Sequence, residues 1–157
     1  MALILQKTDK LEFHTDLRAL IAPIKSEFAS CNWLLTNQDY MVLDYKEKGL
    51  IEKLDHESPK IQFTGTELLK IVETRSIQFI WGVFCGIKGQ IPELAQDQLP
   101  FADCNPNVWS EPDTFFLQES EIEIICFDGT STILKFRNKE VEEKFRVHFE
   151  EAKILVQ

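Results

Sequence analysis

The sequence predicts a single α+β domain spanning residues 1–157, with a mainly antiparallel sheet of about five strands and two or three packed helices. Two observations lead to this fold class. The pair Asp128-Gly129 separates two apolar runs, which is typical of a β-hairpin. Apolar residues also recur at helical spacing in residues 17–28 and 141–152, which indicates helices with one buried face. No linker or repeat divides the chain, and its length suits one core.

The first 30 residues predict a short strand followed by a helix. Residues 2–5 are apolar and fit an edge strand. Thr15 stands where it can cap a helix that buries its apolar stripe. Pro23 is incompatible with a helix interior, because it lacks an N–H and its ring clashes with the preceding turn. We therefore expect a kink, or a second helix with Pro23 in its first turn.

The next segment predicts a hairpin. Residues 32–35 and 40–45 resemble strands, and the polar residues 36–39 between them suit a tight turn. Further along we expect a surface loop at 46–60, a strand at 61–63 and a short helix at 67–75.

The most apolar run, residues 77–87, predicts a central strand covered on both sides. Its odd-numbered residues, from Ile77 to Ile87, should share one face because side chains alternate along a strand. The other face is also largely apolar. Gly82 and Gly86 would let a helix approach this strand closely.

Residues 89–120 form the longest irregular segment, with four prolines and no clear periodicity. Loops of this length are often functional, and the aromatic residues in this one predict that it packs. The chain then continues into the hairpin, with strands at 121–127 and 132–136, and a helix capped by Asn138. The buried stripe of that helix should consist of Val141, Phe145, Phe149 and Ala152.

Composition argues against several classes of protein. No stretch approaches the ~20 apolar residues of a membrane-spanning helix, and no basic leader precedes an apolar run. We therefore expect a soluble, cytoplasmic protein. The four cysteines are widely spaced, which favours free thiols over disulfides or a metal site, and nothing indicates a cofactor. The distinctive charge cluster is acidic, which disfavours nucleic-acid binding.

Catalytic signatures are absent from the sequence, including glycine-rich phosphate loops, G-x-S-x-G and H-E-x-x-H. Cys104 has no histidine in the surrounding segment to activate it, and His148 has no obvious catalytic partner. One alternative stays open. The protein would be an enzyme or small-ligand-binding domain with a pocket under residues 89–120, in which Glu and Asp side chains perform acid–base chemistry.

The charge distribution is the most unusual feature. Between Lys88 and Lys135 there are nine acidic side chains and no Lys, Arg or His. The formal net charge of the chain is −9, so this segment carries all of it. If the carboxylates share a surface, they would steer a basic partner toward the protein, and interleaved aromatic rings would anchor it.

The leading hypothesis is therefore a small acidic intracellular protein that binds a basic protein partner. Acidic immunity proteins, which neutralise nuclease toxins, follow the same charge logic, although no residue motif links this chain to them. The competing interpretation is a solvated acidic loop in an otherwise uncharacterised structural or interaction domain. The candidate partner-binding residues are Phe101, Asp103, Trp109, Glu111, Asp113, Glu119, Glu121 and Glu123, the last two on one solvated strand face.

Overall fold

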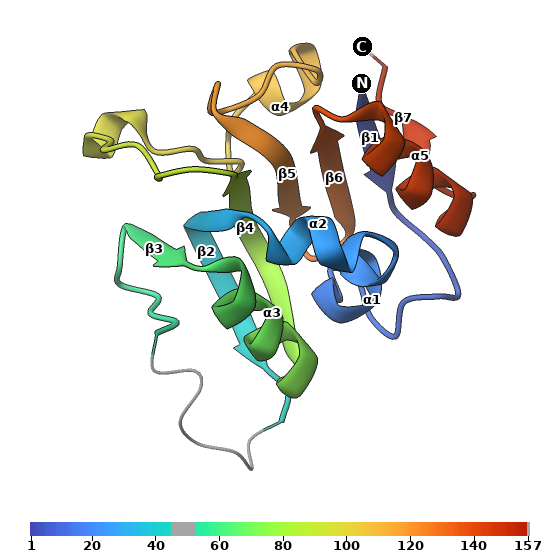
Figure 1. Ribbon diagram of the computed structural model, residues 1–157, viewed down its shortest axis with the longest axis horizontal. Coiled ribbons are helices and arrows are strands. Elements are labelled where there is room, and N and C mark those ends of the chain that lie inside the picture. Colours follow the sequence, from blue (N-terminus) through green and yellow to red (C-terminus); the bar gives the residue numbers. More distant parts are fainter. Residues whose placement is uncertain (45–52, 157) are drawn as a thin grey trace.

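One antiparallel sheet organises the computed structural model, which describes residues 1–44 and 53–156. The α+β class is confirmed, and the sheet has seven strands rather than about five. In order across the sheet they are β3 (Lys60–Phe63), β2 (Asn32–Val42), β4 (Ile77–Ile87), β5 (Ser120–Phe127), β6 (Ser131–Phe136), β1 (Ala2–Leu5) and β7 (Lys153–Ile154) (Figure 1). Sequence patterns give no sign of β7, because two residues are too few to show alternation.

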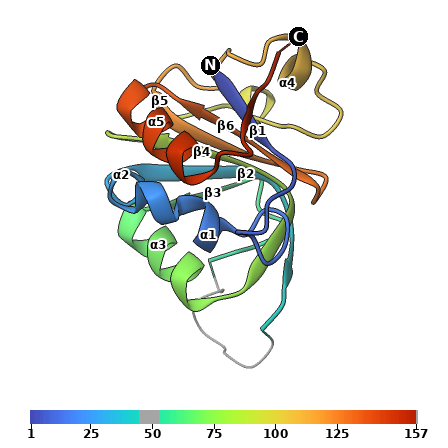
Figure 2. The same cartoon turned by 90° about the vertical axis from the view of Figure 1, so that its right-hand side faces the viewer.

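Helices cover one face of the sheet, which we call the helix face (Figure 2). They are α1 (Leu17–Ile21), the 3-10 turn η1 (Ala22–Ile24), α2 (Lys25–Ala29), α3 (Gly65–Thr74) and α5 (Lys139–His148). In the described residues four α-helices thus pack on this face, rather than two or three, because Pro23 divides the first helical region into two. The opposite face, which we call the loop face, is covered in part by the irregular segment between β4 and β5. That segment contains only the short elements η2 (Gln96–Gln98) and α4 (Asn107–Ser110).

The first helical region is broken as its proline predicts. Pro23 lies in η1, which separates α1 from α2. The prediction that Thr15 caps α1 is wrong, because the cap position is Asp16. Thr15 instead has a positive φ of 63° and is fully buried, and its hydroxyl donates to the carbonyl of Phe79 at 2.6 Å. The side chain thus ties the chain before α1 to β4.

The predicted hairpin at residues 36–39 is wrong, because β2 runs unbroken from Asn32 to Val42. Its pairing with β4 shifts register between Thr36 and Asp39 and shifts back before Tyr40. The polar, turn-like residues therefore form a β-bulge, in which Asn37 has a φ of 52°. Asn tolerates this left-handed conformation, which is why a bulge and a turn look alike in sequence. Of the predicted loop 46–60, only residues 53–59 fall in the described part of the chain.

β4 is central as predicted, but its odd-numbered residues do not share one face. Ile77 and Phe79 join the core on the helix face, whereas Val83 and Cys85 join the core on the loop face. The compensating bulge opposite Asp39 inserts one extra residue into β4 and reverses the alternation. The space beside Gly86 is filled by an aromatic ring of the neighbouring strand, and not by a helix as predicted.

Trp33 on β2 is the cross-strand partner of Gly86 on β4, and its side chain is fully buried. A Cβ atom at residue 86 would lie 2.7 Å from the indole of Trp33, so only glycine fits.

The local predictions in the rest of the chain are confirmed, except that α5 ends at His148, so Phe149 and Ala152 lie beyond the helix whose buried stripe they were predicted to complete. α3 begins with a capping box between Thr64 and Glu67, so it starts slightly earlier than residue 67. The turn between β5 and β6 holds Asp128 and Gly129 at φ 51° and 59°. Asn138 caps α5 by accepting the N–H of Glu140 at 2.8 Å.

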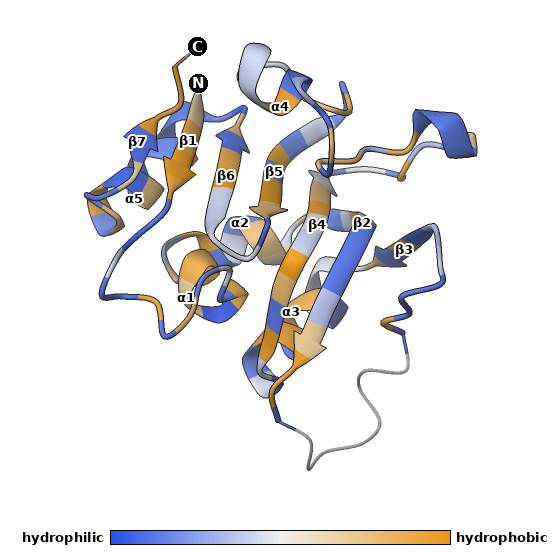
Figure 3. Cartoon of the chain, turned by 180° about the vertical axis from the view of Figure 1, so that it is seen from behind, coloured by the Kyte–Doolittle hydropathy of each residue, from blue (hydrophilic) through white to orange (hydrophobic). Residues whose placement is uncertain are grey.

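Two apolar cores lie on the two faces of the sheet. The larger one packs the helices against the sheet, with Phe28, Phe84 and Phe145 fully buried in it. The smaller one packs the irregular segment 88–119 against the loop face through Ala102, Val108 and Leu117 (Figure 3). These apolar side chains fix the segment to the sheet as a packed layer around Ala102, Val108 and Leu117.

Candidate functional site

The acidic segment is fixed to the sheet by hydrogen bonds from three strands. At the β2 bulge, the Asn37 side-chain oxygen accepts the N–H groups of Ala102 at 2.8 Å and Asp103 at 3.1 Å. The neighbouring Thr36 hydroxyl donates to the carbonyl of Pro100 at 2.7 Å. The bulge therefore acts as the anchor for residues 100–103, which carry two of the predicted site residues.

A buried ion pair anchors the next part of the segment. Glu123 on β5 and Lys135 on β6 are cross-strand partners with 3.3 Å between carboxylate and ammonium. Their side chains are 0% and 3% exposed. Glu123 also accepts the backbone N–H groups of Phe116 and Leu117, both at 3.1 Å. The pair is thereby satisfied by hydrogen bonds, as buried charges must be.

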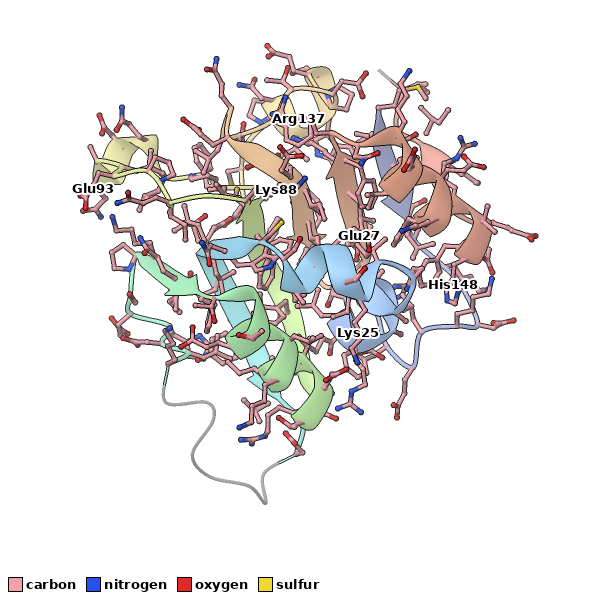
Figure 4. All side chains as sticks on the ribbon, viewed as in Figure 1. Lys25, Glu27, Lys88, Glu93, Arg137 and His148 are labelled. Carbon is pink, nitrogen blue, oxygen red and sulfur yellow. The ribbon has the colours of Figure 1, made fainter. Side chains whose placement is uncertain are left out.

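Lys135 and Arg137 complete this attachment from β6. The Lys135 ammonium donates to the carbonyl of Thr114 and lies 4.5 Å from the ring centre of Phe116. Arg137 donates to the carbonyls of Ser120 and Gln118, both at 2.8 Å, and its guanidinium lies 4.4 Å from the Phe115 ring. These contacts hold residues 114–120 against the end of the sheet (Figure 4).

The prediction that Glu121 and Glu123 form one solvated strand face is therefore wrong. Glu123 is fully buried and serves the ion pair. Glu121 is half-buried where β5 shifts register against β4, between Gly86 and Ile87. Its side chain lines a cavity of about 110 Å³ on the other side of the molecule, together with Glu27, Ser30, Cys31 and Lys88.

The remaining predicted residues lie at the surface, but in different settings. Asp113 is exposed, and its carboxylate accepts the N–H of Ala2 at 2.6 Å, so it also holds β1. Glu119 is exposed just before β5. Asp103 and Glu111 are exposed, and each follows an exposed aromatic residue, Phe101 and Trp109, by two positions in the chain. We call Phe101, Asp103, Trp109 and Glu111 the acidic–aromatic surface.

Trp109 is held in place by rings from the sheet. Its ring centre lies 4.8 Å from that of Phe127, which in turn lies 4.7 Å from that of Trp81. Both contacts are edge-to-face, an arrangement that aromatic pairs prefer. Trp109 keeps 38% of its surface exposed and Phe101 keeps 49%. Trp109 is thus held in place and accessible at the same time, and Phe101 is accessible.

Trp81 and Phe127 are the residues that sequence reasoning missed. The bulge in β4 turns Trp81 toward the loop face, where it packs against the smaller core. The register of the β4–β5 pair places Trp81 and Phe127 at the same level of the sheet. The alternating pattern of β5 could have assigned Phe127 to this face, but nothing in the sequence reveals the bulge.

Most carboxylates of the acidic segment have no cationic partner among residues 1–44 and 53–156. Of the nine, only Glu123 forms an ion pair with a residue that the structure describes. This differs from the remainder of the chain, where Glu27, Glu67 and Glu151 pair with lysines. The unpaired carboxylates keep their charge available to an external cation.

Candidate catalytic groups lie apart from one another. Cys104 is exposed, and a hydrogen bond to Asp103 raises the pKa of its thiol, which makes it a weaker nucleophile at neutral pH. His148 packs edge-to-face on Phe149, with ring centres 4.7 Å apart. The other three cysteines are buried free thiols. In residues 1–44 and 53–156 no group of three or more His, Cys, Asp and Glu side chains could hold a metal ion.

The chain matches no protein-family model, no curated protein sequence and no solved structure. Within its described residues, no helix has the length and apolar character required to cross a membrane. The candidate site therefore rests on its geometry and charge.

Proposed function

We propose that the protein binds a basic protein partner through the acidic–aromatic surface. The observation that carries this proposal is the setting of Trp109. Its ring is partly exposed, is held by Phe127 and Trp81, and lies in a segment whose carboxylates are almost all unpaired with described residues. Tryptophan is among the residues that contribute most to protein interfaces.

Rigidity supports the proposal. A loop that is ordered before binding loses little conformational entropy when the partner arrives, so more of the contact energy appears as affinity. Residues 100–103 and 114–120 are fastened to three strands by Asn37, Glu123 and Arg137. A loop that served solubility alone would not need these attachments.

Charge supports a basic partner. Unpaired carboxylates on one surface raise the rate at which a positively charged protein associates, and this effect weakens with salt. The toxin-neutralising role of an immunity protein is one form that such an activity would take. The partner would then be a nuclease toxin, whose nucleic-acid-binding surface is basic.

Affinity capture with matched baits tests the proposal. The wild-type protein would be compared with Trp109→Ala and with the double variant Glu111→Lys/Asp113→Lys. We expect basic proteins to be captured by the wild type, lost when salt is raised and depleted with both variants, and urea midpoints would show that the double variant stays folded although Asp113 also accepts the Ala2 N–H. Purified partner would then show slower association with the charge variant and faster dissociation with Trp109→Ala. Equal capture by all three baits would contradict the proposal.

A further inference from the structure

The loop face of the sheet is covered over only part of its area. Where β2 ends and β4 begins, Figure 3 shows no segment in front of the strands. Met41 belongs to this open area, because its neighbours Tyr40 and Val42 pack against the core on the helix face. Met41 is 49% exposed, and Gln78 lies opposite it on β4.

The open area is continuous with the aromatic residues. The bulge in β4 brings Ile80 and Trp81 next to each other, and both are half-buried. The β5–β6 turn abuts Ile80, because the Gly129 N–H donates to the Ile80 carbonyl at 2.8 Å. Met41, Ile80, Trp81, Phe127 and Trp109 therefore form one strip of accessible apolar surface, which we call the sheet strip.

Two carboxylates, one on β2 and one in the β5–β6 turn, border the sheet strip. Asp39 is the cross-strand partner of Trp81, so their side chains leave the sheet side by side. Asp128 directly follows Phe127 in the turn. Both are exposed, and neither forms an ion pair with a described residue. Asp39 lies outside the acidic segment of the sequence, so the fold alone adds it to this surface.

We infer that the sheet strip binds an arginine-bearing segment of the partner, with guanidinium groups stacked on Trp81 and Trp109 and paired with Asp39 or Asp128. This inference rests on the proposed function and names the chemistry of the partner. A guanidinium is planar, stacks on aromatic rings and pairs with carboxylates through two parallel hydrogen bonds. An ammonium group is a compact, strongly hydrated charge and gains less from a ring beside a carboxylate.

Synthetic nona-arginine and nona-lysine peptides are the probes. Their charges are equal, so general attraction to an acidic protein contributes similarly to both. Fluorescence anisotropy of labelled peptide would give each dissociation constant at physiological salt. We expect nona-arginine to bind at least about threefold more tightly, as a stacking contribution predicts. Trp81→Leu should remove this preference.

Charge-matched variants locate the site. Asp39→Asn and Asp128→Asn each remove one negative charge, and Asn tolerates the left-handed conformation of residue 128. The control is Glu93→Gln, which removes one charge from an exposed residue in the region of Lys53 and Glu67, far from the turn (Figure 4). We expect each Asp variant to weaken nona-arginine binding at least about threefold and the control to change it less than twofold.

The outcomes separate the two proposals. If Trp109→Ala and Glu111→Gln weaken peptide binding but Asp39→Asn and Trp81→Leu do not, the inference is overturned and the proposed function stands. If no variant differs from Glu93→Gln, both are overturned. Urea midpoints would confirm that each variant is folded. Asp39→Asn decides the result if Trp81→Leu does not fold, because residue 39 is exposed.

Discussion

Removing the charge of Glu123 should be one of the most damaging conservative substitutions in this chain. Glu123→Gln keeps an acceptor oxygen for only one of the N–H groups of Phe116 and Leu117, which bond to different carboxylate oxygens, and it leaves the Lys135 side chain, only 3% exposed, without a countercharge. Breaking a buried pair on one side costs about 3–5 kcal/mol. A domain of this size has about 5–15 kcal/mol of stability in total, so the loss would be large.

Urea denaturation followed by tryptophan fluorescence measures this loss. The double variant Glu123→Gln/Lys135→Met removes both charges and should lose less stability than Glu123→Gln alone, because no buried charge stays unpaired. Glu121→Gln is the control, two residues away on β5 and half-buried, and should change stability by less than about 0.5 kcal/mol. A loss below about 1 kcal/mol for Glu123→Gln would refute the reasoning.

Three further predictions concern the attachments described above. Asn37→Ala removes the acceptor of two N–H groups at a positive φ, and should cost about 1–3 kcal/mol and speed hydrogen exchange at Ala102 and Asp103; unchanged exchange there would contradict the anchor role. Gly86→Ala forces a Cβ into the Trp33 ring and should cost about 1–3 kcal/mol, whereas Gly89→Ala, with open space around it, should be nearly neutral in the same urea titration. In the capping box of α3, a backbone hydrogen bond from Thr64 and then the Lys53 ammonium lower the pKa of Glu67, so its stabilising effect is present above its ordinary pKa of about 4.3 and is lost as pH falls through the lowered value. The difference in urea midpoint between wild type and Glu67→Gln should therefore shrink on acidification, and a constant difference would argue against this contribution.

Local chemistry determined which elements the sequence revealed. The Asp128-Gly129 turn, the Asn138 cap and the break at Pro23 each depend on residues within a few positions of one another. The β2 bulge depends instead on a compensating bulge in β4, more than forty residues away along the chain. From the sequence alone, Asn37 therefore looks like a turn residue, because a bulge can be recognised only when the partner strand is known.

The exposure of the candidate site residues was predictable in part for the same reason. Trp109, Phe101 and Glu111 are exposed as expected, because the segment that carries them lies outside the sheet and no strand register determines which of its side chains face inward. The burial of Glu123 was missed, although a signal for it exists. The turn at Asp128-Gly129 sets the β5–β6 register, and that register places Glu123 opposite Lys135. The pattern in the sequence that indicates a buried ion pair is an acidic residue that the hairpin turn places opposite a lysine, within two otherwise apolar strands.

The position of β1 has a consequence for the order in which the protein assembles. Residues 2–5 are synthesised well before β6 and β7, their strand partners among the described residues, which lie at 131–136 and 153–154. During translation this apolar segment, Ala-Leu-Ile-Leu, has no strand partner until β6 has left the ribosome. Long-range pairing of this kind slows folding and leaves apolar segments open to association. Nascent chains stalled before residue 131 should therefore rely on chaperones to keep residues 2–5 from aggregating.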